Sequence, residues 1–331
     1  SYLAYNYGPD KLIQWIKRDE GSKRGFAASF KQIFKIPISE SWDNWIDFEK
    51  EFQNKNIDNL KKTATNKEEL ISDKVLGGVS HAYHDKKRNK IYVAVNYPGK
   101  IPHLAELDIK SGKIKRLHDV KGPTLFNVTS LTYDEKNQIL FYTTDNDSKR
   151  DLNSYDLKTG KSTLLYKDSR IGDLAFNKVD ESIWGVKHFN GKSTLIKINK
   201  INPENPEKPY TDWEQKYTME FGHDMFDLDI SPDGLNLSAS VTNLNGNQFL
   251  NIYELNSFNP FDKENIKYKE VFEFDVSSPQ SFKYSDDGSY LLGSSYYSGV
   301  SNIFKVDASS LDLEILTNAI TGYFRPIPID D

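Results

Sequence analysis

The chain has 331 residues, of which 37% are hydrophobic and 13% aromatic, with no cysteine and a formal net charge of −5. The absence of cysteine excludes disulfides and thiolate metal sites, and an acidic balance spread along the chain argues against a general nucleic-acid surface. No run of about 18 apolar residues occurs, so we expect no membrane-spanning helix.

Residues 1–60 are predicted to form a small α-helical segment. Pro9 suits the first turn of a helix, and two further stretches repeat their apolar residues at helical spacing. We expect Ser39 or Ser41 to cap the third helix. The apolar positions of the three helices are, in order, Leu12, Ile13 and Ile16; Phe26, Phe30 and Phe34; and Trp42, Trp45, Phe48 and Phe52. We interpret these stripes as the packing faces of a three-helix unit rather than as a binding site.

Residues 61–75 are predicted to be a linker, because polar and charged residues dominate there. After it, a pattern of short strands and turns recurs at spacings of 50, 43, 54 and 54 residues. The copies begin at Ser80, Ser130, Asp173, Asp227 and Ser281. Repeats of this length match a four-stranded blade, so residues 76–331 are predicted to be a β-propeller with five recognisable blades.

Two features of the repeats leave alternatives open. The third and fourth copies carry insertions, from Lys200 and from Asn256, that are either solvated loops or partner-contact surfaces. The segment Gly322–Ile329 looks like the start of a sixth blade. It is either completed by sequence beyond Asp331, which we favour, or it closes the first blade.

A family resemblance covers nearly the whole chain. The segments YLAYNYGPDKLIQWIKR and FAASFKQIFKIPISESWDNWIDF resemble the C-terminal helices of bacterial gluzincin-type (peptidase MA-like) zinc metallopeptidase domains, which a TolB-like propeller follows in a subgroup. The repeat segments Asp229–Gly234 and Tyr284–Gly288 resemble the TolB repeat signature. The resemblance implies a periplasmic or cell-envelope location in a bacterium. We expect the chain to be a piece of a longer protein, because its first residues read as the middle of a helix.

The catalytic residues of that family are not carried over. Its zinc site needs HExxH on a helix, and none of the six histidines lies in that motif. His81 and His84 are three apart without the glutamate, and we interpret both as ordinary strand or loop residues. Asp145, Asp147 and Asp151 are interpreted as polar turn residues rather than as calcium ligands. We therefore expect no catalytic residue, metal or cofactor in this chain, and any zinc ligands of the full-length protein upstream of Ser1.

Candidate binding residues lie where the inner strands begin, because these strands converge on the channel of a propeller. We expect them to form a funnel that suits a polar ligand or a peptide. They are Arg170, Asp173, His223, Asp224, Asp227, Gln280 and Arg325.

The function expected from these observations is an extracytoplasmic propeller that binds protein or peptide partners, is attached to a truncated metallopeptidase-like domain, and is inactive alone. One alternative is a non-enzymatic scaffold for cell-envelope assembly. Another is the propeller lid of a serine oligopeptidase, which predicts a GxSxG hydrolase domain beyond Asp331.

Overall fold

The computed structural model describes residues 2–122, 129–146, 149–262 and 264–329. The chain divides into two compact units, Ser1–Thr65 and Asn66–Asp331. None of the described helices is both long and apolar enough to cross a membrane.

The first unit is helical, and its described residues form four helices rather than the three predicted. They are α1 (Tyr2–Tyr7), α2 (Pro9–Lys17), α3 (Phe26–Phe34) and α4 (Ile38–Leu60). The extra helix arises because Gly8, at a φ of 87°, interrupts the chain immediately before Pro9. A positive φ suits glycine, which has no Cβ to clash.

The predicted cap of α4 is wrong. The helix begins at Ile38 after Pro37, without a capping side chain, and Ser41 lies buried inside it. Proline fixes its own φ near the value that precedes a helix start, so the turn forms without a serine.

Aromatic packing in this unit follows only part of the predicted stripes. Phe30 and Phe34 are buried and stacked with ring centroids 4.3 Å apart, and Trp15 meets Phe30 edge-on at 5.2 Å. By contrast, the side chains of Phe26 and Trp42 remain more than half exposed, at 57% and 59%. The packing role is therefore confirmed for Phe30 and Phe34 of α3 and not for every aromatic residue.

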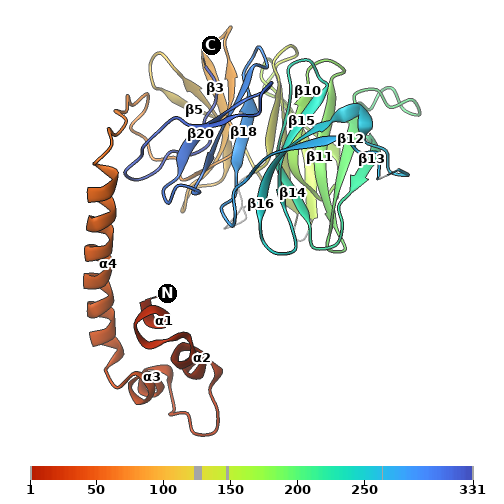
Figure 1. Ribbon diagram of the computed structural model, residues 1–331. Coiled ribbons are helices and arrows are strands. Elements are labelled where there is room, and N and C mark those ends of the chain that lie inside the picture. Colours follow the sequence, from red (N-terminus) through yellow and green to blue (C-terminus); the bar gives the residue numbers. More distant parts are fainter. Residues whose placement is uncertain (1, 123–128, 147–148, 263, 330–331) are drawn as a thin grey trace. The chain divides into compact units, whose positions relative to one another are not determined.

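The second unit is a β-propeller of five antiparallel sheets (Figure 1), each formed by consecutive strands. Blade 1 holds β1 (Gly78–Val79), β2 (Tyr83–Asp85), β3 (Lys90–Asn96), β4 (His103–Asp108) and β5 (Ile114–Asp119). Blade 2 holds β6 (Leu131–Asp134), β7 (Ile139–Asn146), β8 (Lys149–Asp156) and β9 (Ser162–Tyr166). Blade 3 holds β10 (Ile171–Asn177), β11 (Ser182–Phe189), β12 (Lys192–Asn199) and β13 (Asp212–Thr218).

The last two blades follow the same order. Blade 4 holds β14 (Asp224–Ile230), β15 (Asn236–Thr242), β16 (Gln248–Glu254), a short 3₁₀ helix η1 (Leu255–Ser257) and β17 (Tyr268–Glu273). Blade 5 holds β18 (Gln280–Tyr284), β19 (Tyr290–Ser295), β20 (Asn302–Asp307) and β21 (Leu313–Ile315). The prediction of a mainly β chain with five blades is confirmed.

The core of the propeller lies between neighbouring blades. Phe141 and Leu152 of blade 2, for example, form one buried cluster with Ile171 and Leu174 of blade 3. Alternating residues of a strand point to opposite faces of the sheet, so each sheet can bury both faces against its neighbours. The apolar positions recur in the sequence because each blade makes the same kind of contact with its neighbours.

Blade 5 lies beside blade 1 and closes the ring (Figure 1). Lys86 of blade 1 forms an ion pair with Asp286 of blade 5, with Nζ and Oδ2 2.9 Å apart. Within the described residues, 316–329 contain no strand, so the predicted start of a sixth blade is not confirmed. The backbone of this C-terminal segment forms hydrogen bonds with blade 5 instead. The Tyr323 N–H, for example, donates to the Ser301 carbonyl at 2.8 Å.

Candidate functional site

The innermost strand of each blade borders the central channel, and three of these strands carry a β-bulge at the same place. The register shifts on β10, β14 and β18 relative to their neighbours. Asp173, Asp227 and Ser281 occupy equivalent repeat positions there. A bulge leaves one residue out of the hydrogen-bonded ladder, so its N–H is available to another partner.

The two aspartates bind the bulge of the following blade. The Asp227 N–H donates to Asp173 Oδ2 at 3.3 Å, and the Ser281 N–H donates to Asp227 Oδ2 at 3.2 Å. Asp227 and Ser281 have φ values of 51° and 54°. This uncommon conformation for residues other than glycine is held by hydrogen bonds between blades.

His81 reaches across the channel from blade 1 to blade 4. Its Nε2 lies 2.7 Å from Asp227 Oδ1, and the two side chains are only 11% and 15% exposed. His81 Nδ1 is buried, with no hydrogen-bond partner in the part of the chain that the structure describes. A buried nitrogen without a partner is costly, and at a channel mouth it can form a hydrogen bond with a ligand, as a donor when the ring is charged and as an acceptor when it is neutral.

Sequence reasoning missed this role of His81, although one signal was present. At the equivalent position the other four repeats have a buried apolar residue: Leu131, Leu174, Leu228 or Phe282. A histidine at a position where the other four repeats have a large apolar side chain indicates that this position has different surroundings in blade 1. The reason is local, because the inner edge of blade 1 is interrupted between β1 and β2.

The two aspartates differ in their charge balance. Burial, followed by repulsion from Asp227, raises the pKa of Asp173 above its ordinary value. Burial alone would also raise the pKa of Asp227, but the hydrogen bond and charge of His81, with the charge of Arg325, outweigh it and hold that pKa low. Asp227 is therefore the carboxylate that stays ionised, and Asp173 is the carboxyl that is protonated more readily.

These groups border a small cavity of about 50 Å³ at the channel mouth, here called the entrance cavity. It contains three of the seven predicted funnel residues, Asp173, Asp227 and Arg325, together with His81. Ser80, Thr129, Ser130, Leu131 and Leu174 complete its lining. The volume is that of one or two water molecules, so it fits the end group of a ligand rather than a whole peptide.

Arg325 also holds the ring together. Its guanidinium donates to the Val79 carbonyl of blade 1, and its backbone N–H donates to Ser294 Oγ of blade 5 at 3.3 Å. The C-terminal segment thus bridges the two blades that meet at the closure of the ring.

The other four predicted residues do not line the entrance cavity. Asp224 accepts from Ser193 Oγ, and also from the Met225 N–H at 2.8 Å. His223 begins the same stretch, and its Nδ1 is buried without a partner within the described ranges. Arg170 lies over the Phe189 ring, 5.2 Å from its centroid, and Gln280 pairs with Ser294 on β19.

No cluster of three or more histidine, aspartate or glutamate side chains suited to a metal ion occurs among the described residues. Asp145 pairs with Arg150 Nε at 3.2 Å, and Asp151 accepts from the Asn146 side chain at 2.6 Å. Asp147, the third residue of that motif, lies outside the described residues.

A second cavity, here called the inner cavity, lies further along the channel and has a volume of about 100 Å³. All five innermost strands contribute to its lining, through Tyr83, Tyr133, Phe176, Ile230 and Tyr284. Lys283 also lines it and is 6% exposed. Its Nζ lies 3.5 Å from the centroid of the Tyr83 ring.

The charge of Lys283 is poorly compensated. No described carboxylate lies within ion-pair distance of its Nζ, and burial lowers its pKa to about 8 despite the attraction of Asp229 and Asp227. A desolvated cation–π contact contributes about 2 kcal/mol, whereas taking an ammonium out of water costs several kcal/mol. Sequence reasoning missed Lys283, because strand alternation places it on the face opposite Phe282 and Tyr284 but does not reveal what that face meets.

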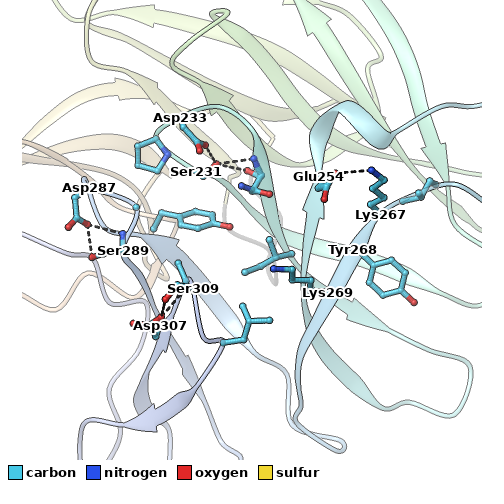
Figure 2. A pocket seen from close by; sticks show the side chains of 18 residues that line it. Ser231, Asp233, Glu254, Lys267, Tyr268, Lys269, Asp287, Ser289, Asp307 and Ser309 are labelled. Atoms are coloured by element: carbon cyan, nitrogen blue, oxygen red, sulfur yellow. Dashed lines mark hydrogen bonds and ion pairs between the residues drawn. The ribbon is translucent and has the colours of Figure 1, made fainter.

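A larger groove of about 740 Å³ separates blades 4 and 5 at their hairpin turns. Figure 2 shows three aspartates around it, each bonded within its own turn: Asp233 to Ser231, Asp287 to Ser289, and Asp307 to Ser309. The insertion of the fourth repeat forms one wall through Ile266 and Lys267. Because these carboxylates already shape turns, we assign the groove no chemistry of its own.

Comparisons with known proteins support the fold. No protein-family model and no curated protein sequence matches the chain. Among solved structures, TolB from Acinetobacter baumannii matches with a TM-score of 0.56 and 11% identity, over 72% of this chain and 53% of that one. The structure of putative TolB from Agrobacterium tumefaciens matches with a TM-score of 0.54 and 10% identity, over 72% of this chain and 80% of that one. A chain of the nidogen/laminin complex matches with a TM-score of 0.50 and 9% identity, over 74% of this chain and 80% of that one.

The match therefore spans only about half the length of the Acinetobacter protein. Identities of this size speak for architecture alone. With the five blades described above, they establish that the second unit of this chain has the fold of a TolB-like β-propeller.

Proposed function

We propose that this protein is an extracytoplasmic binding propeller that engages protein or peptide partners at the mouth of its channel. The observation that carries the proposal is the entrance cavity, where His81, Asp173, Asp227 and Arg325 come together from different blades and the C-terminal segment. His81 Nδ1 still lacks a hydrogen-bond partner among the described residues. Charged groups fixed by a rigid ring can orient a polar end group of a ligand.

The remaining predicted residues would form an outer ring around that mouth. Arg170, His223, Asp224 and Gln280 lie where their inner strands begin, so a longer ligand would meet them after its end group enters. Asp224 is the acidic residue among these four, and its side chain is 50% exposed.

The extracytoplasmic location and the origin of the helical unit rest on the resemblance to metallopeptidase–propeller proteins. We propose that residues 1–60 are the end of such a domain and that this chain alone is inactive. A catalytic zinc of the full-length protein would then be bound by residues outside this chain. An HExxH motif in the preceding coding sequence would support this, and its absence would favour the envelope scaffold.

Panning a random peptide phage library on the immobilised full chain tests the binding role. Peptides enriched on the parent should bind at least tenfold more weakly to Asp227→Asn, with folding checked by circular dichroism. Lys269→Ala, in the groove between blades 4 and 5, serves as the matched control and should bind like the parent. Equal binding to Asp227→Asn, or a loss only with Lys269→Ala, would contradict the proposal.

A further inference from the structure

The inner cavity contains a cation that the fold does not neutralise. Lys283 is almost fully buried, and its Nζ contacts the face of the Tyr83 ring. Within the described residues no carboxylate is at ion-pair distance from it and no hydrogen bond from Nζ is formed. A buried charge without a hydrogen-bonding partner is rare in proteins.

The acidic residues around the cavity are already occupied. Asp229 Oδ2 accepts from the Tyr284 N–H at 2.9 Å. Asp286 pairs with Lys86 at 2.9 Å, and Glu135 lies 3.9 Å from Lys87. Asp286 and Glu135 therefore have cations of their own, whereas Asp229 keeps its negative charge and attracts Lys283 without pairing with it. The Lys283 ammonium is thus the cation of the cavity that can still form an ion pair with an incoming group.

The surroundings of Lys283 suit one small planar anion. The cavity volume of about 100 Å³ accommodates a carboxylate with a few attached atoms. The Thr132 side chain lines the same cavity, but its hydroxyl already interacts with the Tyr83 side chain, so the contact with the anion depends on Lys283. Pro232 and Tyr284 line both this cavity and the groove between blades 4 and 5, so the two spaces are neighbours.

We infer that the inner cavity is a binding site for a carboxylate, with Lys283 as the cation that anchors it. This site is separate from the entrance cavity and goes beyond the function proposed above. The carboxylate comes either from a free small acid or from an acidic side chain of a peptide lying in the groove.

The low pKa of Lys283, about 8, makes the inferred site sensitive to pH near neutrality. Below that value the ammonium is present and attracts the carboxylate, and above it the attraction is lost. The other titratable or charged groups that line the cavity are Tyr83, His84, Tyr133, Glu135, Lys178, Asp229, Tyr284 and Asp286. Of these, Glu135, Asp229 and Asp286 have the partners named above.

Nuclear magnetic resonance of the full chain, labelled with ¹³C at lysine Cε, tests the inference directly. The Lys283 signal is identified as the one missing from Lys283→Arg. Three probes are added: glutarate, the capped peptide acetyl-Gly-Glu-Gly-amide, and acetyl-Gly-Gln-Gly-amide as its neutral control. We expect a saturable shift of the Lys283 signal with glutarate, with the Glu peptide, or with both, and none with the Gln peptide.

The source of the carboxylate follows from which probe binds. Binding of glutarate indicates a free acid, and binding of the Glu peptide alone indicates an acidic segment of a partner. Affinity should fall about tenfold between pH 7 and pH 9, as the protonated fraction of a group with a pKa of about 8 falls. Lys283→Met should abolish binding, whereas Lys269→Gln in the groove should keep it.

The titration of the parent chain needs no variant, so it remains decisive even if Lys283→Met does not fold. A Lys283 signal that no probe shifts, or that the Gln peptide shifts equally, would overturn the inference. So would an affinity for the acidic probes that is unchanged between pH 7 and pH 9. Loss of peptide binding at the entrance cavity would leave this result untouched, because that cavity does not include Lys283.

Discussion

Asparagine substitutions at the two channel aspartates should change stability in opposite directions. Asp227→Asn removes the ionic partner of His81, 2.7 Å away, while the amide oxygen can still accept from the Ser281 N–H. Hydrogen bonds to charged groups contribute about 1.5–3 kcal/mol, so we expect a loss of that size. Asp173→Asn keeps an acceptor for the Asp227 N–H and removes a charge that burial disfavours. We therefore expect it to be neutral or up to about 1 kcal/mol more stable.

The pH dependence follows from the direction of each pKa shift. Asp227 has a lowered pKa in the folded chain, so its contribution is present at neutral pH and is lost as the pH falls through that pKa. Asp173 has a raised pKa in the folded chain. Its charge therefore reduces stability at neutral pH, and this cost disappears in acid. On lowering the pH to 4, the stability difference between Asp173→Asn and the parent should therefore narrow. The difference between Asp227→Asn and the parent should persist at pH 4 and narrow only at lower pH, because the lowered pKa of Asp227 lies below its ordinary value of 3.8.

Guanidinium unfolding followed by circular dichroism at pH 7 and pH 4 measures these differences. Asp224→Asn is the matched control, since its half-exposed side chain predicts a change within about 0.5 kcal/mol. The reasoning would be refuted if both channel variants lost stability equally. It would also be refuted if Asp227→Asn unfolded at the same guanidinium concentration as the parent.

Three further outcomes follow from individual contacts. Gly293→Ala places a Cβ inside the ring of Phe282, so it should cost about 1–3 kcal/mol, measured by urea unfolding, and Phe282→Leu in the same chain should recover part of the loss. Arg325→Ala should speed hydrogen exchange in blades 1 and 5, because it removes a bond to the Val79 carbonyl. Equal exchange in all blades would contradict this. Lys283→Met should be up to about 3 kcal/mol more stable than the parent at pH 7. This gain in stability should fade between pH 8 and pH 10, because the pKa of Lys283 in the folded chain, about 8, lies below its ordinary value. A gain independent of pH would show that packing, not charge, is responsible.

The architecture could be predicted because the repeats carry it locally. The Ser231–Gly234 turn has the expected chemistry, with the Gly234 N–H bonded to the Ser231 carbonyl at 2.8 Å and a φ of 72° at the glycine. The apolar pair Leu131 and Tyr133 is buried between blades as the alternation predicts. Such signals span a few residues, so they are visible without knowing the fold.

The candidate site could be predicted only in part, because it joins residues far apart in the chain. Asp173 and Asp227 were found from their shared repeat position, and the structure brings them together. His81 was missed because its partner is 146 residues away, and Lys283 because burial of a lysine depends on what surrounds it. The bond of Arg325 to Val79 spans 246 residues, and no local pattern reveals it.

The construction of each sheet from consecutive strands affects how the ring comes apart. No described strand from one end of the chain enters a sheet from the other end, so the seam between blades 5 and 1 relies on side chains such as Lys86 and Arg325. Each blade can fold from a short stretch of chain, since its contacts are close in sequence. Under mechanical load or mild denaturant, the ring is therefore expected to part at this seam first. Such a propeller would open at one defined place while its blades stay folded. The contacts of Arg325 with blades 1 and 5 would then be among the interactions that control this opening.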